Sequence, residues 1–268
     1  MRKKILLATA VLCTVGLLGC GGDLQAQTLD EVLAAYYQAH GGLDKLKAVT
    51  AVKMSGKIAF PALGLNLPMV RWQQAPDRLR VETAFPDGKL VQGYDGRTAW
   101  WLNPMLGDQA GEMPEDQARP FREQAEFEDP LVVFREKGYK LELMGREDLE
   151  GKPAFRLKLT RAEGREVFFY LDAESGLLLR STHVVRPAGD ATLIEIIYDD
   201  QRKVAGLLVP FAIENRVAGK TRARLALDAV EFQPVVAPSF FAMPEKNLTP
   251  GKKKAPGKKE PPAKKGGK

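Results

Sequence analysis

Cysteine and histidine are scarce in this 268-residue chain, which has two of each. Both cysteines, Cys13 and Cys20, lie within the first 20 residues. The rest of the chain therefore excludes a disulfide framework, a thiol nucleophile and a cysteine-ligated metal site. His40 and His183 stand alone, with no second histidine or acidic residue at metal-ligand spacing, so no metal is expected.

The sequence also lacks catalytic and nucleotide-binding motifs. It contains neither G-x-S-x-G nor G-x-G-x-x-G. Gly219-Lys220-Thr221 has the ending of a phosphate-binding loop, but Glu214 stands where the first glycine belongs and strands are expected around it, which predicts a hairpin turn. We therefore expect no catalytic residues, no cofactor and no enzymatic activity.

Positive charge is concentrated at one end. Residues 246–268 carry nine lysines and one acid, Glu260, whereas residues 1–245 carry 31 basic and 33 acidic side chains. This near-neutral body excludes nucleic acid as a partner on charge. The tail is rich in Lys, Pro, Gly and Ala and cannot bury a core, which predicts disorder. It is either a simple soluble end or a segment whose lysines bind anionic lipid headgroups or an anionic envelope polymer.

The N-terminus has the pattern of an export signal. Arg2-Lys3-Lys4 precede an apolar run over residues 5–18, shorter than the ~20 residues that span a bilayer as a helix, and residues 1–19 are predicted to be a signal peptide. Leu17-Leu18-Gly19-Cys20 resembles the bacterial lipobox, in which the cysteine is lipidated and becomes the first mature residue. The alternative is an ordinary secretory signal cut after Ala26.

The lipobox resemblance implies a membrane anchor at Cys20 and a lipidated tether over residues 20–27. It places the protein in the cell envelope, facing the periplasm. Gly21 stands where some bacteria use an aspartate as a retention signal, which favours the outer membrane.

A capped helix is predicted to open the folded body. Thr28 and Glu31 form a T-x-x-E capping box, and apolar residues follow at helical spacing until Gly41-Gly42. A short second helical turn is expected over residues 43–49.

Beyond residue 51 the apolar pattern changes to period two. Alternating runs at residues 52–60, 79–83 and 155–160 predict strands. Hairpin signals separate these and further runs, at Asp87-Gly88, Asp95-Gly96, Glu150-Gly151, Glu163-Gly164, Ser175-Gly176 and Gly189-Asp190. This spacing predicts a large antiparallel sheet built from consecutive hairpins.

Residues 104–137 interrupt the strand pattern with a helical insert. The segment is rich in Pro, Glu and Gln, and helices are expected over residues 114–126 and 130–137. The predicted class is therefore mainly β (α+β): a curved antiparallel sheet with an N-terminal helix and a helical insert across one face or open end.

Several strand segments are apolar on both faces, residues 167–171 and 193–198 among them. A sheet with solvent on one side shows clean alternation instead. Two explanations are open: central strands packed on helices on one face and covered by the tail or a dimer on the other, or a curved sheet whose concave face forms an apolar cavity. An acyl chain in such a cavity gains about 0.8 kcal/mol per buried CH₂.

Four segments, in this order along the chain, resemble outer-membrane lipoprotein-sorting proteins of the LolA/LolB-like family. The first is the end of the helix with the first strand, His40-Gly41-Gly42-Leu43 to Lys57, and the second is a D-G-x-x-x-W hairpin, Tyr94-Asp95-Gly96-Arg97-Thr98-Ala99-Trp100-Trp101-Leu102-Asn103-Pro104. The third is a Y-x-D-x-x-S-G-L turn, Tyr170 to Leu177. The fourth is the domain's ending, Gly206-Leu207-Leu208-Val209-Pro210 with Phe241-Ala242-Met243-Pro244. The resemblance implies that residues 28–245 form a half-barrel whose concave face is covered by helices and holds lipoprotein acyl chains.

From this resemblance and the strand pattern we expect a non-enzymatic envelope lipoprotein that binds lipid or lipoprotein acyl chains, in lipoprotein sorting or transfer. The alternative is an envelope signalling or scaffold module that uses the same fold to bind a protein partner. The residues expected to line the cavity are Met54, Ile58, Val70, Trp72, Leu79, Val81, Trp100, Leu157, Phe169, Ile194 and Ile196.

Overall fold

A computed structural model of the chain describes residues 27–186 and 189–245. The predicted signal peptide, the lipidation site Cys20, most of the tether and the basic tail lie outside these residues, so those expectations remain predictions.

The N-terminal helices form where the sequence predicts them. Helix α1 (Leu29–Ala39) is capped by Thr28 and Glu31, each side chain bonded to the backbone N–H of the other residue. Gly41 has a φ of 106°, and a Cβ there would lie 2.3 Å from the carbonyl oxygen of Gly206. Glycine at this position therefore allows the end of α1 to pack against a turn of the sheet. Helix α2 (Leu43–Ala48) follows directly.

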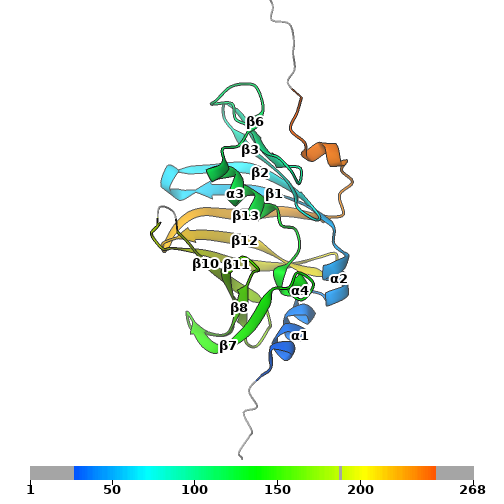
Figure 1. Cartoon of the computed structure of the whole chain (residues 1–268), viewed down its shortest axis with the longest axis vertical. Coiled ribbons are helices and arrows are strands. Elements are labelled where there is room, and N and C mark those ends of the chain that lie inside the picture. Colours follow the sequence, from blue (N-terminus) through cyan, green and yellow to red (C-terminus); the bar gives the residue numbers. More distant parts are fainter. Residues whose placement is uncertain (1–26, 187–188, 246–268) are drawn as a thin grey trace, which may run out of the picture.

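The described residues form one open, curved, mainly β half-barrel in which thirteen antiparallel strands lie in the order β6-β5-β4-β3-β2-β1-β13-β12-β11-β10-β9-β8-β7 (Figure 1). Every neighbouring pair is also consecutive in the chain except β1 with β13, as expected for a sheet of hairpins. The strands are β1 (Ala51–Phe60), β2 (Leu65–Gln74), β3 (Arg78–Phe85), β4 (Gly88–Tyr94), β5 (Ala99–Leu102), β6 (Gly111–Glu112), β7 (Lys140–Leu149), β8 (Lys152–Thr160), β9 (Glu166–Asp172), β10 (Leu178–Val185), β11 (Thr192–Val204), β12 (Leu207–Val217) and β13 (Lys220–Phe232).

Helices cover one face of this sheet, here called the inner face. Helix α1 and the short helix α4 (Pro130–Val133) pack on strands β7–β9 in a core that includes Leu33, Leu131, Leu157 and Phe169. Helix α3 (Glu115–Ala125) packs on the other half of the sheet. The predicted insert over residues 104–137 contains the short strand β6, and its helices cover the inner face, as Figure 1 shows. The predicted helix over residues 130–137 is shorter than expected and ends in turns after Val133.

Helix α3 is held by packing more than by helix propensity. Pro120 lies inside it and removes one backbone donor from the helical ladder. Its apolar face, made by Ala118, Phe121 and Ala125, is buried against a cluster of sheet residues that contains Leu79, Tyr94, Ala99 and Met113.

The C-terminal segment covers part of the opposite, outer face, a contact that the strand pattern does not reveal. The short 3₁₀ helix η3 (Pro238–Phe241) places Phe241 in a fully buried position. The indole Nε1 of Trp100 donates to the carbonyl oxygen of Phe241 at 2.8 Å. Arg80 donates to the carbonyl oxygen of Phe240 at 2.9 Å and lies over its ring.

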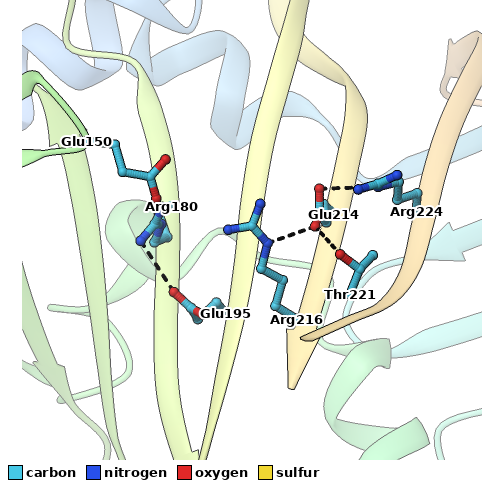
Figure 2. Close-up of polar contacts among 7 residues, drawn as sticks. All are labelled: Glu150, Arg180, Glu195, Glu214, Arg216, Thr221 and Arg224. Atoms are coloured by element: carbon cyan, nitrogen blue, oxygen red, sulfur yellow. Dashed lines mark hydrogen bonds and ion pairs between the residues drawn. The ribbon is translucent and has the colours of Figure 1, made fainter. Parts of the chain in front are cut away.

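Polar side chains on the outer face link β10 to β11, and β12 to β13 (Figure 2). Arg180 pairs with Glu195 at 3.3 Å and also contacts Glu150. Glu214 accepts from Arg216 at 2.7 Å, from the hydroxyl of Thr221 at 2.6 Å and from Arg224 at 3.3 Å. The bonds of Arg180 with Glu195, and of Thr221 and Arg224 with Glu214, cross strand boundaries and so join neighbouring strands in the middle of the sheet.

We expect Glu214→Gln to make the protein less stable at neutral pH and less sensitive to acid. The hydrogen bond from Arg216, followed by that from Thr221, lowers the pKa of Glu214 from 4.5 to about 2. Its stabilisation is therefore complete above pH 4.5 and is lost as the pH falls through 2. Urea unfolding should show the variant about 1–2 kcal/mol less stable at pH 7, with a difference that shrinks as the pH falls from 4.5 to 2.

The matched control is Glu231→Gln on the neighbouring strand. Glu231 is 59% exposed and lies 3.7 Å from Lys53. An exposed pair of this kind contributes 0–1 kcal/mol. Equal losses from the two substitutions would contradict the role given to the Glu214 network.

Candidate binding cavity

A cavity of about 450 Å³ lies on the inner face between the sheet and helices α2 and α4. Its floor comes from β1, β2, β12 and β13, and its roof from α4 and the segment that joins α3 to α4. Most of the lining is apolar. The lining residues are Leu46, Lys47, Val49, Thr50, Val52, Met54, Gln73, Ala75, Phe127, Glu128, Asp129, Val132, Val133, Glu136, Leu207, Leu208, Val209, Val230 and Phe232.

Strand β2 fixes the end of α3 beside this cavity. The amide of Gln73 donates to the carbonyl oxygens of Gln124 at 3.1 Å and Glu126 at 3.0 Å, and Arg71 donates to that of Gln124 at 2.8 Å. Burial lowers the pKa of Arg71 to about 10. The backbone N–H of Phe127 donates to the carbonyl oxygen of Pro76 at 3.2 Å. The carbonyl oxygens at the end of α3 have no partners within the helix, and they accept hydrogen bonds from the sheet instead.

Hydrogen bonds from α1 fix the other side of the roof. The hydroxyl of Tyr36 donates to Asp129, and that of Tyr37 donates to the carbonyl oxygen of Leu131 at 2.7 Å. Asp129 also caps α4 through the backbone N–H of Leu131. Burial raises the pKa of Asp129, and burial with the nearby Asp129 raises that of Tyr36. His40, whose pKa burial lowers, bonds the carbonyl oxygen of Tyr36.

Ion pairs lie at the cavity's exposed border. Lys47 of α2 pairs with Glu136 at 2.5 Å, and Glu128 pairs with Lys137 at 2.8 Å. These side chains are substantially exposed, so the ion pairs contribute little to the stability of the fold. The arrangement is a mostly apolar pocket bordered by exposed ion pairs.

A second set of ion pairs attaches α3 and the segment after it to the far half of the sheet. Arg161 pairs with Glu126 and Arg165 with Glu123, at 2.5 and 2.6 Å. Residues 115–126 are thus bonded to β2 in one half of the sheet and to the connection between β8 and β9 in the other half.

Eight of the eleven predicted cavity residues lie on the inner face, as the strand register shows. Paired residues of antiparallel strands share a face, and Met54 is paired with both Arg71 and Val230. Of the eight, Met54 alone lines the described cavity. The remaining seven lie along the same face, under α3, under α1 and α4, or between them: Ile58, Leu79, Val81, Leu157, Phe169, Ile194 and Ile196.

Val70, Trp72 and Trp100 lie on the outer face, which corrects their predicted place in the cavity. Trp72 pairs with Arg80, and Arg80 pairs with Gly93, which in turn pairs with Trp100. Trp72 also packs edge-on against Phe240, with ring centroids 5.1 Å apart. The C-terminal segment contacts Trp72 and Trp100 on this outer face, opposite to α3.

Sequence reasoning missed Arg71, Gln73 and most of the cavity wall. Arg71 and Gln73 continue the inner-face alternation of Leu67 and Met69 with polar side chains. Polar residues at inward positions of a strand are the signal that could have identified them, because buried polar groups need partners. The wall residues from α2, α4 and the start of β12 carried no such signal.

Neither a metal centre nor a spanning helix is found in the described part of the chain. Residues 27–186 and 189–245 contain no group of three or more His, Cys, Asp or Glu side chains arranged to hold a metal. No helix within them is long and apolar enough to cross a membrane. His183 is half-buried on the inner face, where burial lowers its pKa.

The chain matches no family model and no curated protein sequence. Its fold, however, matches solved structures. A LolA superfamily protein from Nitrosomonas europaea superposes with a TM-score of 0.54 and 14% identity, over 81% of this chain and 98% of that chain. A Vibrio parahaemolyticus domain described as an outer membrane lipoprotein-sorting protein gives 0.54 and 12%, over 79% and 94%.

A DUF1329 family protein from Desulfovibrio piger gives a TM-score of 0.56 at 11% identity, over 78% of this chain and 97% of that chain. Identities this low establish the architecture and not the activity. The chain has a LolA-like fold, as the sequence motifs predict.

Proposed function

We propose that this protein binds lipid or the acyl chains of lipoproteins on the inner face of its half-barrel, as a non-enzymatic step in lipoprotein sorting or transfer. The observation that carries the proposal is the cavity of about 450 Å³, whose lining is mostly apolar. A pocket of this size and chemistry is typical of small-molecule sites. The LolA-like fold supports the same assignment.

The expected surroundings of the protein fit this role. The lipobox-like sequence at Cys20 supports attachment to a membrane facing the periplasm, with the outer membrane favoured. A carrier fixed there would receive or release its ligand next to the bilayer. The exposed ion pair of Lys47 and Glu136 at the border would leave a ligand's polar end in water.

Met54→Asp should weaken lipid binding at least 100-fold. Met54 lies on the cavity floor opposite Arg71, and a carboxylate there would bring a charged, hydrated group into the space of an alkyl chain. The test uses residues 20–268 with Cys20→Ala, which retains every described residue. Native mass spectrometry after incubation with phospholipid measures the bound fraction.

The matched control is Ser55→Asp, one residue along β1 and facing the outer side. It should bind lipid like the parent chain. If neither the parent nor the control binds any lipid, the cavity is not a lipid site. The alternative, a signalling or scaffold module that binds a protein partner, would then be favoured.

A further inference from the structure

Three neighbouring strand connections form one rim of the half-barrel, away from the cavity. They are the β1–β2 turn (residues 57–65), the β12–β13 turn (217–223) and the ends of β10 and β11 (184–186 and 189–193). We propose that this surface, here called the docking rim, binds an anionic lipid surface. No residue of the rim lines the cavity, so the inference goes beyond the proposed function and does not depend on it.

The sheet holds the parts of the docking rim side by side. Strand β13 lies between β1 and β12, and β11 lies between β12 and β10. The 3₁₀ helix η1 (Pro61–Leu63) in the β1–β2 turn contacts β13. The backbone N–H of Ala218 donates to the carbonyl oxygen of Leu193 at 2.9 Å, which joins the β12–β13 turn to β11. At about 4.8 Å per strand, the rim from β2 to β10 is roughly 24 Å wide, which suits a surface and not a small ion.

Large aliphatic side chains are exposed on this rim. Leu63 is 69% exposed in the β1–β2 turn, where Pro61 and Ala62 are exposed as well. Val184 and Leu193 are 41% and 42% exposed and are paired across β10 and β11. Apolar side chains in this position gain free energy by entering the boundary between the headgroups and acyl chains of a bilayer.

Cations accompany these aliphatic side chains. Lys57, Arg186, Lys220 and Arg222 are exposed, and none of them forms an ion pair within residues 27–186 and 189–245. The rim's segments contain one acidic residue, Asp190, although acidic residues outnumber basic ones over residues 1–245. The positive charge is therefore local to the rim. Cations beside apolar side chains match the phosphates that lie above the acyl chains of an anionic bilayer.

A lipid surface fits the rim better than an acidic protein does. Neither the binding cavity nor the smaller cavity beside Phe85 and Pro104 includes a residue of the rim, so neither cavity offers it a recess for a partner's side chains. A bilayer needs no recess, because protruding side chains enter it. The predicted anchor at Cys20 would also keep a bilayer close to the folded body.

The first test places an environment-sensitive fluorophore on the rim. Residues 20–268 with Cys20→Ala contain no cysteine, so Ala62→Cys supplies a single attachment site beside Leu63. With vesicles of equal parts phosphatidylglycerol and phosphatidylcholine, the emission should rise about twofold or more and shift to the blue, as the label leaves water. The same label at Val235→Cys, a fully exposed position outside the rim, should not respond.

This readout separates the rim from the basic tail, residues 246–268, which both labelled proteins retain. Unchanged emission at residue 62 while the protein sediments with the vesicles would show attachment by the tail alone and overturn the proposal. Absence of any binding to the anionic vesicles would also overturn it, and an acidic protein surface would then be favoured as the partner.

The second test measures affinity for the same vesicles by sedimentation at low salt. Lys220→Gln combined with Arg222→Gln should weaken binding about 30-fold, since each cation next to an anionic surface contributes about fivefold. The control combines Arg97→Gln with Lys152→Gln, two exposed cations in turns at the opposite rim, and should stay within about twofold of the parent. Equal losses would contradict a specific docking rim.

Failure of this proposal and failure of the proposed function are distinguishable. Met54→Asp should abolish lipid binding in the cavity and leave vesicle docking unchanged. The Lys220→Gln, Arg222→Gln variant should show the reverse: weaker docking with normal lipid occupancy by native mass spectrometry. Loss of docking in Met54→Asp would mean that the cavity, and not the rim, holds the protein to the vesicle.

Discussion

Trp100→Ala should lower the free energy of unfolding by about 3–5 kcal/mol. The side chain of Trp100 is 0% exposed, and its indole donates to the carbonyl oxygen of Phe241 at 2.8 Å. Its ring also covers Gly93, where a Cβ would lie 2.3 Å from a ring atom. The substitution thus creates a cavity and leaves a buried carbonyl without its donor. Urea unfolding followed by circular dichroism measures the loss.

A second substitution separates the contribution of ring packing from that of the hydrogen bond to the C-terminal segment. Trp72→Ala removes a half-buried ring that contacts Phe240 from the same face, and we expect a loss of about 1–2 kcal/mol. Because both tryptophans lie on the outer face, neither substitution should change the lipid affinity of the folded protein. A Trp100→Ala variant of normal stability would show that the C-terminal segment does not bury this residue.

These two tryptophans also show what a strand pattern can and cannot predict. Alternation and hairpin signals predicted strands at residues 52–60, 79–83 and 155–160, and the structure confirms them. Alternation divides a strand into two sets of side chains but does not say which set faces inward. Trp72 and Trp100 were assigned inward as large apolar residues, yet Phe240 and Phe241, about 140 residues after Trp100, cover them.

The apolar residues on both faces of strand β9 have a similar explanation. Phe169 faces inward and is buried with α1 and α4, as its position predicts. Phe168 faces outward, where the guanidinium of Arg156 lies 4.3 Å from its ring centre. A long cationic side chain can cover an aromatic ring without a second layer of structure. The strand's composition alone does not distinguish this arrangement from a dimer contact.

The cavity was the least predictable part because it is assembled from segments distant in sequence. Met54 was predicted from its strand position, but Leu46, Val132 and Leu207 come from three other elements. The hydrogen bonds of Gln73 and Asp129 hold these elements around the cavity. Such contacts depend on tertiary geometry, which local propensity does not encode.

Phe121→Ala should release helix α3 from the inner face while the sheet remains folded. Phe121 is buried in the cluster that holds α3, and its truncation costs about 3–5 kcal/mol where the site cannot collapse. The helix has little stability of its own, since it has eleven residues and an internal proline. Its amides should exchange with solvent at least 100-fold faster, as measured by hydrogen exchange with mass spectrometry.

The control for this prediction is Arg119→Ala, an exposed position on the same helix. It should leave exchange in α3 within about twofold of the parent, because surface substitutions change stability by less than about 0.5 kcal/mol. Strands β8 and β9 should keep their protection in both variants. Equal acceleration in those strands would mean that α3 and the sheet unfold together. Local release would instead make the helix a separable cover, so that the inner face could be exposed without loss of the half-barrel.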